Sequence, residues 1–146
     1  MSEGQEINVS SARDALSLLS QKMYSKFGAD ALPEIEYVWH KLGLAVGEKM
    51  KKNLPDTNLS TVARSFTDGA RKRGTKIDLI KLDDKVYHLK SYACALGLKG
   101  KGRDLCAAAM GCDRGIFESA TEMPVKLSII QTLAANDECC EVIFEV

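Results

Sequence analysis

The stretch KIDLIKLDDKVYHLKS, residues 76–91, decides the fold class. It contains two short segments that mix apolar with polar residues, 76–82 and 85–91, on either side of Asp83-Asp84. Segments of this kind around a short polar connection are typical of a β-hairpin. The expected register pairs Leu79 with His88 and Ile80 with Tyr87. The stretch therefore predicts the first two strands of an antiparallel sheet.

A second hairpin is predicted at the end of the chain. Its strands cover residues 124–133 and 140–146, joined by residues 134–138. The last strand alternates apolar with acidic positions, which is typical of a strand with one buried face: Val142, Phe144 and Val146 alternate with Glu141 and Glu145.

Before residue 76 the apolar residues recur at helical rather than strand spacing. Three amphipathic helices are predicted, over residues 10–27, 30–53 and 58–72. Their expected inward faces are Ala12, Ala15, Leu16, Leu19, Met23 and Phe27; Ile35, Val38, Trp39, Leu42, Val46 and Met50; and Leu59, Val62, Ala63, Phe66 and Ala70. A fourth helix is expected over residues 103–119, between the two hairpins.

The order of these elements indicates an α+β fold: three helices, a hairpin, a helix and a second hairpin. We expect an antiparallel four-stranded sheet with the helices packed on one face. Residues 1–9 are polar and aperiodic and are predicted to be a disordered tail. Residues 10–146 are predicted to form a single small-molecule-binding domain.

Composition narrows the possible function classes. Lys plus Arg and Asp plus Glu number 20 each, so no net positive charge favours nucleic acid or an acidic membrane surface. The chain has no apolar run near the roughly 20 residues of a membrane span and no secretory signal at its start. It also lacks the phosphate- and dinucleotide-binding glycine motifs, and we expect no cofactor. These features predict a cytoplasmic protein with no nucleic-acid or membrane partner.

All five cysteines lie at or after position 94, namely Cys94, Cys106, Cys112, Cys139 and Cys140. An odd number without a paired framework favours free thiols in a reducing compartment. Strand parity turns Cys140 towards the core and Cys139 outward, and Cys112 is interpreted as a packing residue. The spacing of paired zinc knuckles is absent, so no metal site is expected.

One stripe of the fourth helix combines a thiol with an acid. Cys106, Met110, Asp113 and Phe117 follow one another at intervals of four, three and four residues and share a face. We predict that this face lines a pocket against the sheet, together with Tyr87 and Cys140. The alternative is that Cys106 and Met110 are core residues and Asp113 lies at a solvated edge.

The C-terminal half also resembles a known superfamily. Leu105-Cys106, Asp113-Arg114-Gly115 and residues 130–144 look like the end of the 4-vinyl reductase-like domains and of the related L-2-amino-thiazoline-4-carboxylic acid hydrolases. The resemblance implies an α+β fold with a pocket between helices and sheet, often dimeric, that serves as a sensor or for ring-opening hydrolysis. Asn136-Asp137 replaces the Gly-Asp turn of that superfamily, which Asn can satisfy in a left-handed conformation.

One departure from the superfamily bears on metal binding. Its metal-bearing members show Glu-x-x-Cys-x7-Cys at the last hairpin, whereas this chain has Ile129-x-x-Thr132-x7-Cys140. A zinc site of that type is therefore not expected.

Three hypotheses follow. The first is a cytoplasmic, sensor-like small-molecule-binding domain that forms a homodimer. The second is a hydrolase of L-2-amino-thiazoline-4-carboxylate or a related cyclic amidine or amide, a C–N bond hydrolase. In it Asp113 serves as general acid or base and Cys106 as nucleophile or substrate contact, and His88 is the candidate base if the first hairpin lies over the Cys106 helix. The third is an interaction module that dimerises through Gly43 and Gly47, whose spacing lets two helices approach closely.

Overall fold

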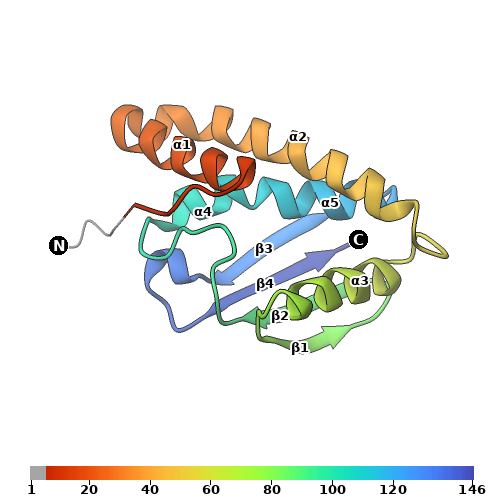
Figure 1. The fold of residues 1–146 in the computed structure, drawn as a ribbon. Helices are drawn as coiled ribbons and strands as arrows, with labels where there is room; N and C mark the ends of the chain where they lie inside the picture. Colours follow the sequence, from red (N-terminus) through yellow and green to blue (C-terminus); the bar gives the residue numbers. More distant parts are fainter. Residues whose placement is uncertain (1–5) are drawn as a thin grey trace.

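The computed structural model describes residues 6–146 and confirms the predicted α+β class (Figure 1). The elements in chain order are α1 (Ala12–Phe27), η1 (Gly28–Ala31), α2 (Leu32–Lys51), α3 (Leu59–Lys72), β1 (Ile77–Leu82), β2 (Val86–Ser91), α4 (Arg103–Ala109), α5 (Gly111–Thr121), β3 (Lys126–Gln131), η2 (Leu133–Ala135) and β4 (Cys140–Glu145). Within residues 6–146 no helix has the length and apolar character that crossing a membrane requires.

The four strands form one antiparallel sheet in the order β1-β2-β4-β3. The predicted register of the first hairpin is wrong, because Leu79 pairs with Leu89 and Lys81 with His88. The hairpin closes where the amide of Asp83 donates to the carbonyl of Val86 at 3.0 Å. The tip is therefore Asp84-Lys85 rather than Asp83-Asp84, and a bulge at Ile80 takes up the remaining offset.

The helices cover the sheet in layers, as Figure 1 shows. The sheet residues that face them are buried, among them Tyr87, Leu89, Val142 and Phe144. Helices α3 and α5 contribute to the same hydrophobic cluster as β1, β2 and β4. Helix α2 packs along α5, and α1 lies beside α2. The interior of the molecule is thus built on one face of the sheet.

The predicted inward stripe of α1 is wrong. Leu19 and Phe27 are 57% and 53% exposed, whereas Ser17 and Ser20 are buried. Both serines are buried because both are hydrogen-bonded. The hydroxyl of Ser17 donates to the carbonyl of Leu96 at 2.5 Å, and that of Ser20 accepts from the indole N–H of Trp39 at 2.9 Å. Polar contacts therefore help to orient α1; Leu19, Met23 and Phe27 point outward, whereas Leu16 packs against the core.

Gly43 and Gly47 of α2 face α5 inside the molecule. A Cβ added at Gly43 would overlap the carbonyl oxygen of Cys112, and one at Gly47 would overlap that of Ile116. The two glycines are needed for this close helix packing. The hypothesis that they form a dimer contact is therefore wrong, because the surface they offer is already covered.

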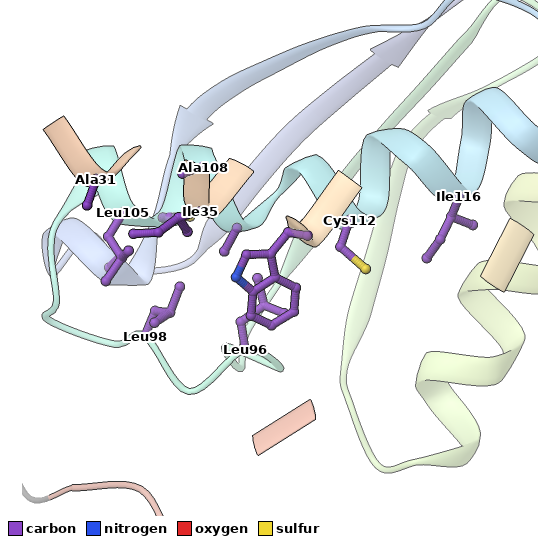
Figure 2. Packing of buried hydrophobic residues seen from close by; sticks show 12 residues of the cluster. Ala31, Ile35, Leu96, Leu98, Leu105, Ala108, Cys112 and Ile116 are labelled. Atoms are coloured by element: carbon purple, nitrogen blue, oxygen red, sulfur yellow. The ribbon is translucent and has the colours of Figure 1, made fainter. Parts of the chain in front are cut away.

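The predicted fourth helix is interrupted at Met110, which separates α4 from α5. Gly111 and Gly115 follow the break, and a Cβ at Gly115 would lie 2.7 Å from the carbonyl oxygen of His40. The glycines on α5 and α2 therefore form one tight seam between the two helices. Figure 2 shows the cluster next to this seam, with Cys112 and Ile116 along α5 and Leu96 and Leu98 on the loop before α4.

The predicted tail lies partly outside the described residues, which begin at position 6. Residues 6–10 belong to no helix or strand. Glu6 accepts a hydrogen bond from Lys22 at 2.6 Å, and the Ile7 side chain lies beside Gly97. The last residues before α1 thus follow the loop that contains Leu96 and Leu98.

Candidate functional site

A cavity of about 240 Å³ lies between the sheet and the helices α3 and α5. Met50, Phe66 and Met110 line it and also pack against both hydrophobic clusters of the interior. The cavity is therefore located where the two clusters meet. Its floor comes from the sheet, with Leu89, Ile129, Val142 and Phe144 among the lining residues.

Among residues 6–146, Asp113 is the one carboxylate that lines this cavity. Its side chain is partly buried and makes no hydrogen bond or ion pair with residues 6–146. Burial raises its pKa to about 6, while the guanidinium groups of Arg13 and Arg73 act in the opposite direction. A carboxyl group that accepts no hydrogen bond from residues 6–146 thus lines a mostly apolar cavity, where its oxygens can accept one from a ligand.

Three thiols join Asp113 at the cavity wall: Cys94, Cys106 and Cys140. The Thr132 hydroxyl links two of them, because it donates to the sulfur of Cys106 at 3.2 Å and lies 3.9 Å from that of Cys140. Helix phase and strand parity predicted that these two cysteines face a common interior, and the structure brings them to the same wall.

Two of these thiols, Cys106 and Cys140, are not activated. Burial raises the pKa of Cys106 to about 11 and also raises that of Cys140. A thiol with such a pKa is protonated near neutral pH, which makes it a poor nucleophile and a poor metal ligand. Across the described residues, no group of three or more His, Cys, Asp or Glu side chains is placed to hold a metal ion.

Tyr87 and Phe117, two of the predicted ligand contacts, do not line the cavity. Both are fully buried in an aromatic cluster with Phe66 and Phe144. The Phe117 and Phe144 rings stack with centroids 4.4 Å apart, and the Tyr87 hydroxyl is hydrogen-bonded to that of Thr67 at 2.5 Å. The prediction is corrected here: these two rings support the cavity wall from behind, whereas Phe66 and Phe144 form its surface.

His88, the predicted base, lies on the opposite face of the sheet. Its strand neighbours Tyr87 and Leu89 face the helices, so strand alternation turns His88 away from them. Its Nε2 is 2.7 Å from Oε2 of Glu141. The pairing of Cys106 with His88 that the hydrolase hypothesis requires is therefore absent, and nothing in the cavity geometry favours hydrolysis.

The two remaining cysteines are both buried. Cys112 packs in the seam against Gly43, as a packing residue should. Cys139 was expected to point outward, but it is only 4% exposed. The expectation failed because Cys139 precedes β4, whose first residue is Cys140, so strand alternation does not govern its side chain.

Sequence reasoning missed the two arginines at the cavity. Arg13 stands at the start of α1 and Arg73 directly after α3, and both are exposed residues that line the cavity. The basic run around Arg73 is equally typical of a solvated helix end, so the sequence carried no signal that these distant residues meet. Together they place two exposed cations at the cavity that contains the partly buried Asp113 carboxyl group.

The chain matches no protein-family model and no curated protein. Its fold is similar to that of solved structures. One is a trafficking protein particle complex subunit 3 from Naegleria fowleri covalently bound to palmitic acid, with a TM-score of 0.61 and 15% identity over 92% of this chain and 94% of that one. Another is the phenol-responsive sensory domain of the transcription activator PoxR with phenol, with a TM-score of 0.54 and 11% identity over 97% of this chain and 77% of that one.

At these identities the likeness shows a shared fold alone. It agrees with the α+β architecture that the sequence predicts, and it does not confirm the resemblance to the 4-vinyl reductase-like domains. That resemblance stays a prediction.

Proposed function

We propose that this chain is a sensor-like small-molecule-binding domain whose ligand occupies the cavity beside Asp113. The observation that carries the proposal is the Asp113 carboxyl group, which makes no hydrogen bond or ion pair within residues 6–146 and lines a cavity whose wall is mostly apolar. Burial raises the pKa of this carboxyl group to about 6, because its charged form is less well solvated there than in water. A ligand with a hydrogen-bond donor would satisfy it.

Cavity size restricts the ligand class. The volume of about 240 Å³ exceeds the roughly 150 Å³ that admits benzene into a protein interior. It is smaller than the roughly 300–1,000 Å³ of pockets for drug-sized ligands. We infer a ligand of about one ring, with an apolar body against Met110 and Phe144 and one donor group directed to Asp113.

Two further observations support the proposal. The structural neighbours with this fold include one protein with phenol bound and one with covalent palmitate. All five cysteines are free thiols, in keeping with the prediction of a cytoplasmic location.

The test compares three one-ring probes of similar size by calorimetric titration: benzylamine, toluene and benzoate. Benzylamine should bind about 10- to 100-fold more tightly than toluene, because a hydrogen bond to a charged group contributes about 1.5–3 kcal/mol. Benzoate should bind more weakly than benzylamine, because its carboxylate would be repelled by that of Asp113, even though Arg13 and Arg73 also line the cavity.

Asp113→Asn should remove the preference for benzylamine over toluene while toluene still binds. Ser65→Phe should fill the cavity from α3 and abolish binding of all three probes, with Arg64→Glu on the same helix as the matched control. Absence of binding by any probe, or a preference for benzoate over benzylamine, would contradict the proposed ligand class.

A further inference from the structure

A second concave surface lies outside the core, between α1 and α2. It is lined almost entirely by apolar residues, including Leu16, Leu19, Met23, Phe27, Ile35 and Val38. Several of these side chains are largely exposed, and Val38 is 50% exposed. Proteins that remain monomeric rarely expose continuous apolar patches of this kind, so the groove indicates an interaction surface.

The charges around the groove indicate what it binds. Asp30 and Glu34 line one end, and no Lys or Arg within the described residues lines any part of it. A partner that fills the groove must therefore be apolar at its centre and basic where it meets these acids.

The outward stripe of α2 has that composition. It consists of Glu34, Tyr37, Val38 and Lys41, all exposed, at helical spacing of three, one and three residues. Lys41 is held on the stripe, because its Nζ lies 5.7 Å from the centre of the Tyr37 ring. The stripe thus carries an acid at one end, two apolar side chains in the middle and a base at the other end.

This stripe is complementary to itself. Glu34 is three residues before Tyr37, and Lys41 is three residues after Val38. If two α2 helices pack antiparallel about a two-fold axis between Tyr37 and Val38, Glu34 of each copy lies opposite Lys41 of the other. The same operation places Val38 against Tyr37 of the second copy, as an isologous contact requires.

We propose that the occupant of the groove is a second copy of this chain. The two copies pack antiparallel through the outward stripes of α2, and each delivers its Lys41 to the acidic end of the other copy's groove. The contact forms two Glu34–Lys41 ion pairs and covers the exposed side chains of α1 at its edge. It is independent of the ligand cavity, which lies on the other side of α2 and α5.

The experiment is a charge exchange measured by sedimentation velocity on the full chain. Glu34→Lys and Lys41→Glu each place two like-charged pairs in the dimer, and each should weaken association about tenfold or more. When the two variants are mixed, both cross-pairs become attractive and a heterodimer should form. Native mass spectrometry with one variant labelled with ¹⁵N identifies that species.

Val38→Asp should yield a folded monomer, because the side chain is 50% exposed within one copy. Arg64→Glu on α3 controls for charge reversal elsewhere and should leave the dimer intact. The proposal is overturned if the unmodified chain sediments as a monomer throughout the accessible concentration range. A dimer unaffected by Val38→Asp, or a mixture of the two charge variants that yields no heterodimer, would also overturn it.

Discussion

The two sides of α5 are packed in opposite ways. Towards α2 the backbones touch, because Gly43 and Gly47 of one helix meet the chain around Cys112 and Ile116 of the other. Towards the sheet the same helix leaves about 240 Å³ open, with Asp113 at the opening's wall. Small residues close one side and a polar residue faces the open one. The comparison shows how a rigid seam can hold a cavity whose walls would otherwise collapse together.

The seam should be the part of the molecule least tolerant of change. Gly43→Ala should lower the free energy of unfolding by about 3 kcal/mol or more, because the added Cβ would overlap the backbone of Cys112 and force the helices apart. Urea unfolding measures the change. In the matched control Gly69→Ala, the nearest atom to the new Cβ is 3.5 Å away. This control should gain about 0.5–1 kcal/mol from better helix propensity, and equal losses in both variants would refute a special role for the seam.

On the cavity side of α5, the Asp113 carboxyl group should make the stability of the fold depend on pH. The folded pKa of Asp113, about 6, lies above the roughly 4 of an unfolded chain, so folding favours the protonated carboxyl. Its contribution to stability is complete below about pH 4 and is lost as the pH rises through about 6. Asp113→Asn should therefore be more stable than the unmodified chain at pH 7, by about 1–2 kcal/mol, with little difference at pH 4.

Thermal melts of both proteins between pH 4 and pH 7 provide the measurement. Asp68→Asn, on the exposed side of α3, controls for the loss of a negative charge. If the difference in stability between Asp113→Asn and the unmodified chain does not grow with pH, burial does not raise the pKa of the Asp113 carboxyl group.

The side of α2 that packs against α1 offers a third test. Ser20→Ala removes the acceptor of the Trp39 indole N–H, a bond of 2.9 Å in the buried interface with α1. A buried donor without a partner costs about 1–2 kcal/mol, and chemical denaturation should show a loss of that size. Ser25→Ala, at an exposed position of the same helix, should be nearly neutral. A neutral Ser20→Ala would mean that the apolar surface of Trp39 alone positions α1.

The smallest effect is expected at the solvent edge of the seam. Glu118 of α5 lies 2.6 Å from Nε2 of His40 on α2 and accepts from Arg114 at 2.8 Å. Partly exposed pairs of this kind contribute at most about 1 kcal/mol, so Glu118→Gln should cost less than that. Glu122→Gln, which alters a far more exposed side chain, provides the control. A loss as large as that of Gly43→Ala would indicate that charged groups, rather than close backbone contact, stabilise the seam.

The sequence predicts the elements better than it predicts their orientation. Helix α3 follows its pattern, with Val62 and Ala63 buried as expected. Helix α1 does not, since Ser17 and Ser20 are inside and Leu19 is outside. Hydrophobic periodicity records side-chain polarity but not hydrogen-bond partners, and both serines are buried through partners distant in the sequence.

In the candidate site, too, local patterns were predictable from the sequence and contacts between distant residues were not. Cys106, Met110 and Asp113 reach one cavity because their spacing on neighbouring turns is local information. Phe117 is one turn farther along α5, where Phe144 fills the space, and no pattern within the helix reports that ring. Arg13 and Arg73 reach the cavity only through tertiary packing.

The two outer strands carry matching irregularities, with bulges at Ile80 in β1 and at Ile130 in β3. The bulged isoleucines are 50% and 52% exposed, whereas the inner strands β2 and β4 pair without a shift. A straight, regular edge strand is a template on which another chain can extend the sheet, and a bulge spoils that template by twisting the edge and leaving one residue unpaired. Both free margins of this sheet are thus protected against edge-to-edge aggregation, which reserves self-association for the helical side of the molecule.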